Sequence, residues 1–120
     1  MNCIEEHFEI AKDKLNASRA PLENDMYADS VSRSYYGMFN AAKALLLTED
    51  SSPKTHSGVA TELGKLFRDR IDRELLSDLS RLQELREKSD YTNYQPTENE
   101  AEEVLQTAEE FVSKSKSLTP

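Results

Sequence analysis

The sequence predicts an all-α fold, an antiparallel up-and-down bundle of four to five helices. Apolar residues recur at helical spacing along nearly all of the 120 residues. Only three glycines and four prolines are present, which leaves little room for a turn-rich sheet protein. The chain is 37% hydrophobic and 32% charged, but its regular periodicity indicates a folded core instead of disorder. We expect residues 1–120 to form a single helical domain, because this length suits one core.

The first two helices are expected up to Pro21 and over about residues 24–47. Asn2 and Glu5 have the spacing of an N-cap and its third helical residue, and Pro21 should end the first helix just before it. The second helix would be about 35 Å long, which suits the spine of a bundle. Its predicted inner face consists of Tyr27, Val31, Tyr35, Met38, Ala42 and Leu45.

Two further helices are expected after the polar loop at residues 48–54. Thr55 can cap the third helix, whose apolar positions are Val59, Leu63, Leu66 and Phe67. A bend near residues 69–72 should lead to a fourth helix with a leucine stripe. This helix should fray by Tyr94, since Pro96 disfavours helical geometry in the residue before it.

The fifth helix should begin after Thr97, which has the capping-box spacing to Glu100. Its predicted buried face consists of Ala101, Val104, Ala108, Phe111 and Val112. Residues 98–110 contain six glutamates and no basic residue. The last helix is therefore expected to be amphipathic, with an acidic outer face.

The formal net charge of −8 argues against non-specific binding to nucleic acid, and no DNA partner is expected. A local basic patch could still bind RNA, because eight of the fifteen lysines and arginines lie between Lys54 and Lys88. The single cysteine excludes an internal disulfide, and no signal peptide or transmembrane run is evident. We therefore expect a cytoplasmic protein without a membrane partner.

No cofactor or metal is expected from the sequence. The two histidines and one cysteine lie far apart and do not form a zinc pattern. A glycine-rich phosphate loop is also lacking in the sequence.

The most informative position is Arg86, because the leucine stripe of the fourth helix leads directly to it. The stripe consists of Leu75, Leu79 and Leu82. A guanidinium directed at a bundle core keeps its charge and needs acceptors. Asp90 lies four residues further along and can pair with it. Two interpretations stay open, a structural ion pair or a polar site that binds phosphate.

The other face of the second helix carries Arg33, Tyr36, Asn40 and Lys43. It is either a solvated face or a helix-to-helix dimer contact. We favour the dimer contact, because Gly37 beside Tyr36 would let another helix approach closely. Arg33, Tyr36 and Asn40 are also candidates for binding a nucleotide or phosphate.

Two other parts of the sequence, the start of the third helix and Tyr91, have a functional and an ordinary interpretation. Lys54 and His56 lie at the start of the third helix, where free backbone N–H groups favour an anion such as a nucleotide phosphate. They could equally be polar residues of a first turn. Tyr91 is either an amphipathic residue at a helix end or a hydrogen-bond donor to phosphate, a stacking surface or a site of modification.

Three segments in this order closely resemble the HEPN domains of the small stand-alone prokaryotic branch. They are residues 32–46 (SRSYYGMFNAAKALL), 54–58 (KTHSG) and 85–91 (LREKSDY). The resemblance covers nearly the whole chain. It implies a helical bundle that forms a homodimer and is paired with a minimal nucleotidyltransferase. In such pairs the HEPN protein is often a toxin RNase and the nucleotidyltransferase its antitoxin.

Active HEPN proteins carry an arginine, four to six residues and then a histidine. Arg86 matches the arginine, but Tyr91 stands where the histidine would be, and no histidine follows His56. Metal-independent RNA cleavage needs a group that takes and returns the proton of a 2′-hydroxyl, as imidazole does near neutral pH. A phenol, with an ordinary pKa near 10, donates well but is a poor base. His56 could replace the missing histidine only if the fold placed it beside Arg86.

Two functions therefore stay open. One is a toxin-type, metal-independent RNase in which Arg86 steadies the scissile phosphate, with Tyr91, Asp90 or His56 assisting. The other is a non-catalytic nucleotide- or partner-binding module that docks a nucleotidyltransferase. In a third, purely structural interpretation, Arg86 locks two helices together. The sequence favours the toxin–antitoxin role, with weak or absent nuclease chemistry.

Overall fold

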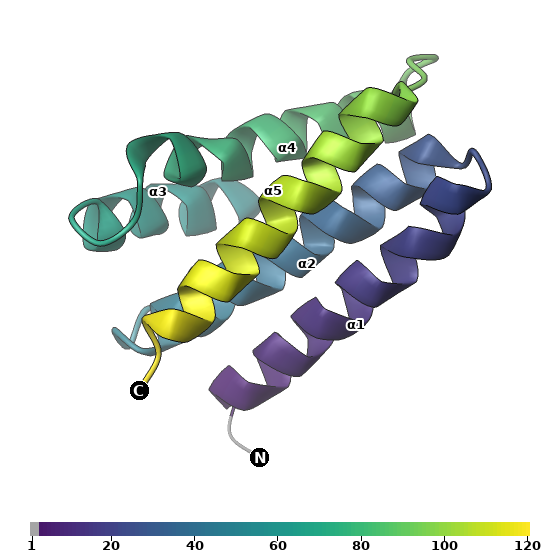
Figure 1. Cartoon of the computed structure of the whole chain (residues 1–120). Coiled ribbons are helices and arrows are strands. Elements are labelled where there is room, and N and C mark those ends of the chain that lie inside the picture. Colours follow the sequence, from purple (N-terminus) through teal and green to yellow (C-terminus); the bar gives the residue numbers. More distant parts are fainter. Residues whose placement is uncertain (1–2) are drawn as a thin grey trace.

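The computed structural model describes residues 3–120 (Figure 1), and within this range the chain consists of five helices, which confirms the predicted all-α class. The helices are α1 (Cys3–Glu23), α2 (Tyr27–Leu47), α3 (His56–Phe67), α4 (Arg73–Tyr91) and α5 (Glu98–Ser117). None of these described helices combines the length and the apolar character needed to cross a bilayer.

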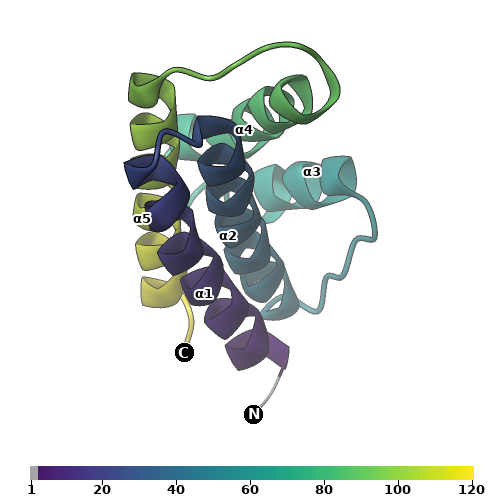
Figure 2. The ribbon, with the colours of Figure 1, turned by 90° about the vertical axis from the view of Figure 1, so that its right-hand side faces the viewer.

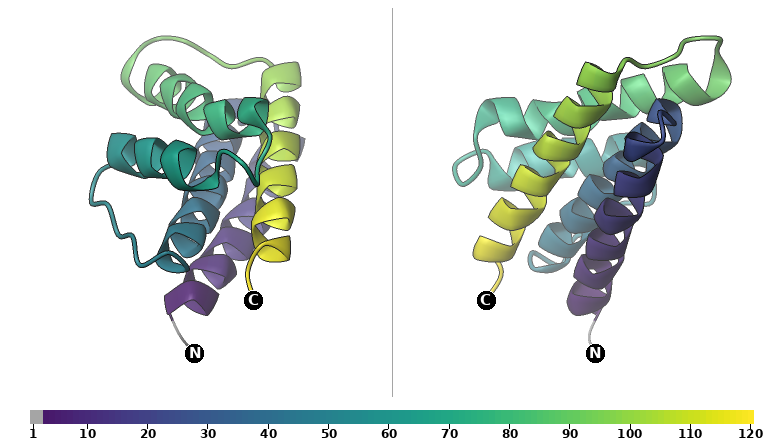
Figure 3. Two further views of the ribbon diagram at one scale, coloured as in Figure 1. Left: turned by 90° about the vertical axis from the view of Figure 1, so that its left-hand side faces the viewer. Right: turned by 45° about the vertical axis from the view of Figure 1, so that its right-hand side comes forward.

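The central element of the fold is α2, which contacts each of the other four helices. The long helices α1, α2 and α5 lie side by side, and α1 runs antiparallel to α2. The pair formed by α3 and α4 packs across α2 from another side (Figure 2, Figure 3). This pair brings the chain back toward the start of α2, so α5 runs in the same direction as α2. The crossing places the middle of α2 against both α3 and α4.

The core forms where the apolar faces of all five helices meet. Its largest fully buried side chains include Tyr35, Phe67, Phe111, Met38, Leu45 and Leu46. Gly37 is buried as well, but the helix that approaches it is α1 of the same chain. A Cβ atom at Gly37 would lie 2.7 Å from the side chain of Leu15. The glycine therefore has a packing role within the chain, and it gives no support to the dimer contact expected there.

The connection between α1 and α2 differs from the sequence prediction. The expected N-cap at Asn2 lies outside the described residues. The prediction that α1 ends before Pro21 is wrong, because the helix continues to Glu23 with Pro21 in its last turn. A proline there removes one N–H donor near the helix end, which a helix tolerates better than the same loss at its centre. The second helix begins at Tyr27 instead of residue 24, since Asp25 adopts a left-handed turn with φ of 61°.

Two predicted helix starts are confirmed by their capping hydrogen bonds. Thr55 accepts a hydrogen bond from the backbone N–H of Gly58 at 2.9 Å, at the start of α3. At the start of α5, the hydroxyl of Thr97 accepts from the N–H of Glu100 at 3.1 Å. The carboxylate of Glu100 accepts from the N–H of Thr97 at 2.9 Å, which completes a capping box.

Removal of the Thr97 cap should destabilise the fold. We expect Thr97→Ala to lower the free energy of unfolding by about 1 kcal/mol, because the first turn of α5 loses an acceptor. Urea denaturation measures the change. Thr61→Ala, in the exposed interior of α3, is the matched control and should cause no loss, since alanine is the better helix former. Equal losses in the two variants would contradict the capping role.

Glu100 should also make stability depend on pH. A hydrogen bond from Tyr94 and the N–H of Thr97 lower the pKa of Glu100 below its ordinary value of 4.5. A carboxylate whose pKa is lowered by folding stabilises the protein above its unfolded pKa, and this stability is lost as pH falls through the folded pKa. The native protein should therefore exceed Glu100→Gln in stability at neutral pH. The difference should shrink below about pH 4.5. A difference that stays constant from pH 7 to pH 3 in chemical denaturation would contradict this expectation.

Candidate functional site

Arg86 lies buried between α4 and α2, with only 9% of its side chain exposed. Its Nη1 atom donates to Oδ2 of Asp90 at 3.1 Å. The guanidinium also lies over two aromatic rings, with its Cζ atom 5.2 Å from the ring centroid of Tyr36 and 5.6 Å from that of Tyr35. A cation held by ring faces and one carboxylate is stabilised without being neutralised on every side.

The guanidinium of Arg86 stays charged in this environment. Burial lowers its pKa, but Tyr36, Tyr91 and Asp90 together raise the pKa by more. The Nε atom is buried and has no hydrogen-bond partner among the described residues. Arg86 is therefore a fixed cation whose hydrogen-bonding capacity is only partly used.

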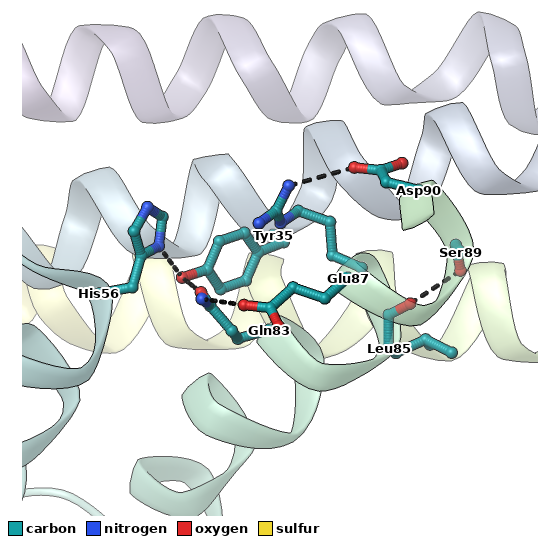
Figure 4. A network of polar contacts seen from close by, with 8 residues as sticks. Tyr35, His56, Gln83, Leu85, Glu87, Ser89 and Asp90 are labelled. Atoms are coloured by element: carbon teal, nitrogen blue, oxygen red, sulfur yellow. Dashed lines mark hydrogen bonds and ion pairs between the residues drawn. The ribbon is translucent and has the colours of Figure 1, made fainter. Parts of the chain in front are cut away.

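A chain of hydrogen bonds next to this cation joins α4, α2 and α3 (Figure 4). It begins at Glu87, whose carboxylate accepts from Nε2 of Gln83 at 2.7 Å. This contact orients the amide, so the Oε1 atom of Gln83 faces Tyr35 and accepts its hydroxyl proton. The hydroxyl oxygen of Tyr35 then lies 2.6 Å from Nδ1 of His56.

This chain of hydrogen bonds determines which ring nitrogen of His56 carries a proton. A tyrosine hydroxyl has one proton, and Tyr35 gives that proton to Gln83, which can only accept at Oε1. The contact with His56 must therefore run the other way, with Nδ1–H donating to the oxygen of Tyr35. Burial raises the pKa of Tyr35 well above its ordinary value, and Arg86 offsets part of this shift. The hydroxyl stays protonated, and in the neutral tautomer with its proton on Nδ1, His56 has its lone pair on Nε2.

The two tyrosine rings bring His56 and Arg86 to one site. The imidazole lies 5.7 Å from the ring of Tyr35 and 6.0 Å from that of Tyr36, measured between centroids. It also stacks on Phe39 at 4.2 Å with an interplanar angle of 11°. A replacement for the missing histidine would have to lie beside Arg86. His56 and Arg86 do lie against the same pair of rings.

The remaining predicted site residues lie at different distances from this centre. Asp90 pairs with Arg86, and Tyr91, although 76% exposed at the end of α4, also interacts with Arg86 through its side chain. Arg33 is exposed and pairs with Asp29 at 3.0 Å, one turn away on α2. Arg33 is therefore occupied by a local ion pair.

Asn40 and Lys54 also lie outside the cluster around Arg86. The amide of Asn40 donates to the carbonyl of Tyr36 at 2.8 Å, and its Oδ1 atom lies 3.1 Å from Nδ1 of His7. Asn40 thus ties α2 to α1. Lys54 is exposed in the loop before α3 and shares the lining of a cavity with His56.

Three residues of the hydrogen-bond chain are missing from the sequence prediction as site residues. The sequence pattern places Tyr35 only on the apolar face of its helix, and it gives Gln83 and Glu87 no role. One signal was present, since a buried tyrosine normally finds a partner for its hydroxyl. Gln83 and Glu87 are also four residues apart, which allows them to pair on one helix face.

The hydrogen-bond chain borders a small cavity of about 260 Å³, whose lining includes Tyr35, His56, Gln83 and Glu87. Within residues 3–120, no group of three or more His, Cys, Asp or Glu side chains could hold a metal ion. An imidazole such as that of His56 can transfer a proton, and a guanidinium such as that of Arg86 can stabilise negative charge.

Comparisons with known proteins agree with this architecture. The HEPN domain family model matches residues 4–118. A Methanocaldococcus jannaschii protein named as a candidate toxin is 41% identical over 94% of this chain and 86% of its own length. A second protein of that organism with the same kind of name is 35% identical over 94% of this chain and 79% of its own. A crystal structure from Thermus thermophilus has a TM-score of 0.83 over 98% of both chains, and its 22% identity limits this likeness to the fold.

The central hydroxyl of the chain can be tested by Tyr35→Phe. This change leaves Nδ1 of His56 and Oε1 of Gln83 without their shared partner, and should lower the free energy of unfolding by about 1–2 kcal/mol. Tyr27→Phe is the control, because its hydroxyl interacts only with carboxylates that are exposed, those of Asp25 and Glu98. It should cost less than about 0.5 kcal/mol. Chemical denaturation compares the variants, and equal costs would contradict the hydrogen-bond chain.

Proposed function

The chain belongs to the HEPN domain family and is a toxin-like member of it, and we propose that it cleaves single-stranded RNA without a metal ion. The observation that carries this proposal is the hydrogen-bond chain that leaves Nε2 of His56 able to accept a proton beside the charge of Arg86. The names of the relatives from Methanocaldococcus jannaschii support a toxin role.

The proposed reaction is an attack of a ribose 2′-hydroxyl on the adjacent phosphate. His56 takes the 2′-hydroxyl proton at Nε2 while a bond forms from O2′ to phosphorus. The bond from phosphorus to O5′ breaks, and the leaving oxygen takes the proton from the imidazolium. The products are a 2′,3′-cyclic phosphate and a free 5′-hydroxyl end, with no net gain or loss of protons.

Arg86 and Glu87 would support opposite charges in this reaction. The guanidinium of Arg86 would stabilise the negative charge that develops on the phosphoryl oxygens. The imidazolium that forms on His56 would be stabilised by Glu87 through Gln83 and Tyr35, since each proton in the chain is donated toward that carboxylate.

We also propose that the protein acts as a homodimer with a minimal nucleotidyltransferase as its antitoxin. The HEPN resemblance supports both assignments, because paired arginine motifs face each other across the dimer in that family. The exposed ring of Tyr91 follows Arg86 by a little more than one turn of α4. Its side chain interacts with Arg86, and its exposed ring would contact RNA, the second subunit or the antitoxin.

One observation favours the alternative, a non-catalytic module that binds a nucleotide or the nucleotidyltransferase. Arg86 is 9% exposed and already bonded to Asp90, and the family's histidine is replaced by Tyr91. In this case the binding of a partner would raise the melting temperature through linkage, and no RNA would be cut.

Cleavage of a single-stranded RNA in the presence of EDTA tests the main proposal. We expect His56→Ala to lower kcat by about 100-fold or more, because the proton acceptor is lost. Arg86→Lys should also lower kcat, since lysine keeps the charge but not the planar fork of donors. Arg81→Ala is the control on the same helix, because this arginine is exposed and pairs with Asp78.

Each variant is first checked for its helical circular dichroism and melting temperature, so that loss of fold is separated from loss of chemistry. Cleavage that survives both His56→Ala and Arg86→Lys would overturn the assigned roles. An absence of cleavage, together with a rise in melting temperature when the nucleotidyltransferase is added, would favour the binding module instead.

A further inference from the structure

We infer that a second cavity, which shares His56 with the proposed cleavage site, is a subsite for the neighbouring nucleotide of a single-stranded RNA. The cavity has a volume of about 700 Å³ and is lined from α1, α2, the loop after α2 and the start of α3. Lys43 and Lys54 would contact phosphate, and the wall formed by Phe39 and its apolar neighbours would hold the base. This inference rests on the proposed cleavage of RNA.

The charge of the lining is the first argument for this subsite. The chain has a net charge of −8, and four other cavities of the described residues each include at least one carboxylate residue. The described residues that line this cavity include no carboxylate, but they include two lysines, Lys43 and Lys54, and two histidines, His7 and His56. On an acidic protein, such a cavity is where a phosphate meets the least repulsion.

The two lysines keep their charge available to a ligand. Neither forms an ion pair with a described residue, and the ammonium of Lys43 lies 5.5 Å from the ring centroid of Phe39. An aromatic ring attracts a cation without neutralising it. The ammonium group of Lys43 is therefore held near the cavity and still able to bind phosphate.

The wall of the cavity suits a nucleobase. Phe39 and the stacked imidazole of His56 contribute rings, and Leu46, Leu47 and Pro53 contribute apolar surface. Lysines next to aromatic and apolar surface are the combination that sequence-tolerant sites for single strands use. The volume also lies within the roughly 300–1,000 Å³ of small-molecule sites.

The position of His56 indicates in which direction a bound RNA strand would run. This residue lines both the 700 Å³ cavity and the small cavity beside Gln83. The small cavity includes Glu84 and Glu87, whose carboxylates would repel a phosphate. A strand whose scissile linkage lies at His56 would therefore continue into the larger cavity.

Cys3 makes the occupancy of this cavity measurable without any cleavage. It is the single cysteine of the chain, it is exposed, and it belongs to the lining of the cavity. We would follow its alkylation by a maleimide in the native protein, with and without a short 2′-O-methyl oligouridine. This RNA cannot be cut, because its 2′-oxygens are blocked. The bound RNA should slow the alkylation several-fold.

Lysine variants test which charges hold the strand. Lys43→Ala and Lys54→Ala should each weaken the protection of Cys3. Each should also reduce the slope of log affinity against log salt concentration by about 0.7, as expected when one phosphate contact to a single strand is lost. Lys65→Ala is the matched control, because Lys65 is exposed on α3 and lies in none of the described cavities. It should behave as the native protein does.

The outcomes separate the subsite from the cleavage proposal. Cleavage of unmodified RNA with Cys3 unprotected, or equal protection in all three lysine variants, would overturn the subsite and leave the cleavage proposal standing. Protection that needs Lys43 and Lys54, without cleavage, would support the subsite and overturn the nuclease chemistry. If uridine monophosphate protected Cys3 as well as the oligomer at equal concentration, the assignment to an RNA strand would be wrong.

Discussion

The candidate site depends on the contact between the guanidinium of Arg86 and the rings of Tyr35 and Tyr36. A buried cation is costly, and its attraction to one carboxylate and two ring faces offsets part of that cost. The same two rings lie against His56. The two tyrosines that stabilise the guanidinium therefore also position the imidazole. The crossing of α2 by α3 and α4 brings these groups together, which links the fold directly to the proposed chemistry.

The incomplete pairing of Arg86 helps to decide between its structural and functional interpretations. An arginine that only locked two helices would be expected to use most of its donors, because buried polar groups are normally hydrogen-bonded. Here Nη1 bonds Asp90 and the side chain also interacts with Tyr91, but the buried Nε has no partner among residues 3–120. The raised pKa keeps the group charged. A charged and under-used guanidinium beside a polarised imidazole favours recognition of a phosphate over a purely structural role.

The sequence predicts the elements of this fold better than it predicts the site. Apolar periodicity and capping residues such as Thr55 and Thr97 are local signals, so the starts of α3 and α5 follow from them. The prediction for the α1–α2 connection is wrong for two reasons. A proline in the last turn of a helix costs little stability, and the left-handed conformation of Asp25 has no strong sequence signature. Arg86 follows from its leucine stripe. The contact of His56 with Tyr35 depends on how two helices cross, which no spacing along the chain records.

In the proposed reaction, His56 would supply the imidazole that the family carries where Tyr91 stands in this chain. Catalytic groups are defined by geometry and role, and the same arrangement can be built from different positions in a chain. An imidazole at the end of α4 would share a helix with Arg86, whereas His56 arrives from α3 and is oriented by a tyrosine on α2. That orientation requires Gln83 to fix the hydroxyl proton of Tyr35 and Glu87 to fix the amide of Gln83. Tyr35, Gln83 and Glu87, none of which was predicted as a site residue, are thus the ones that would make His56 a base.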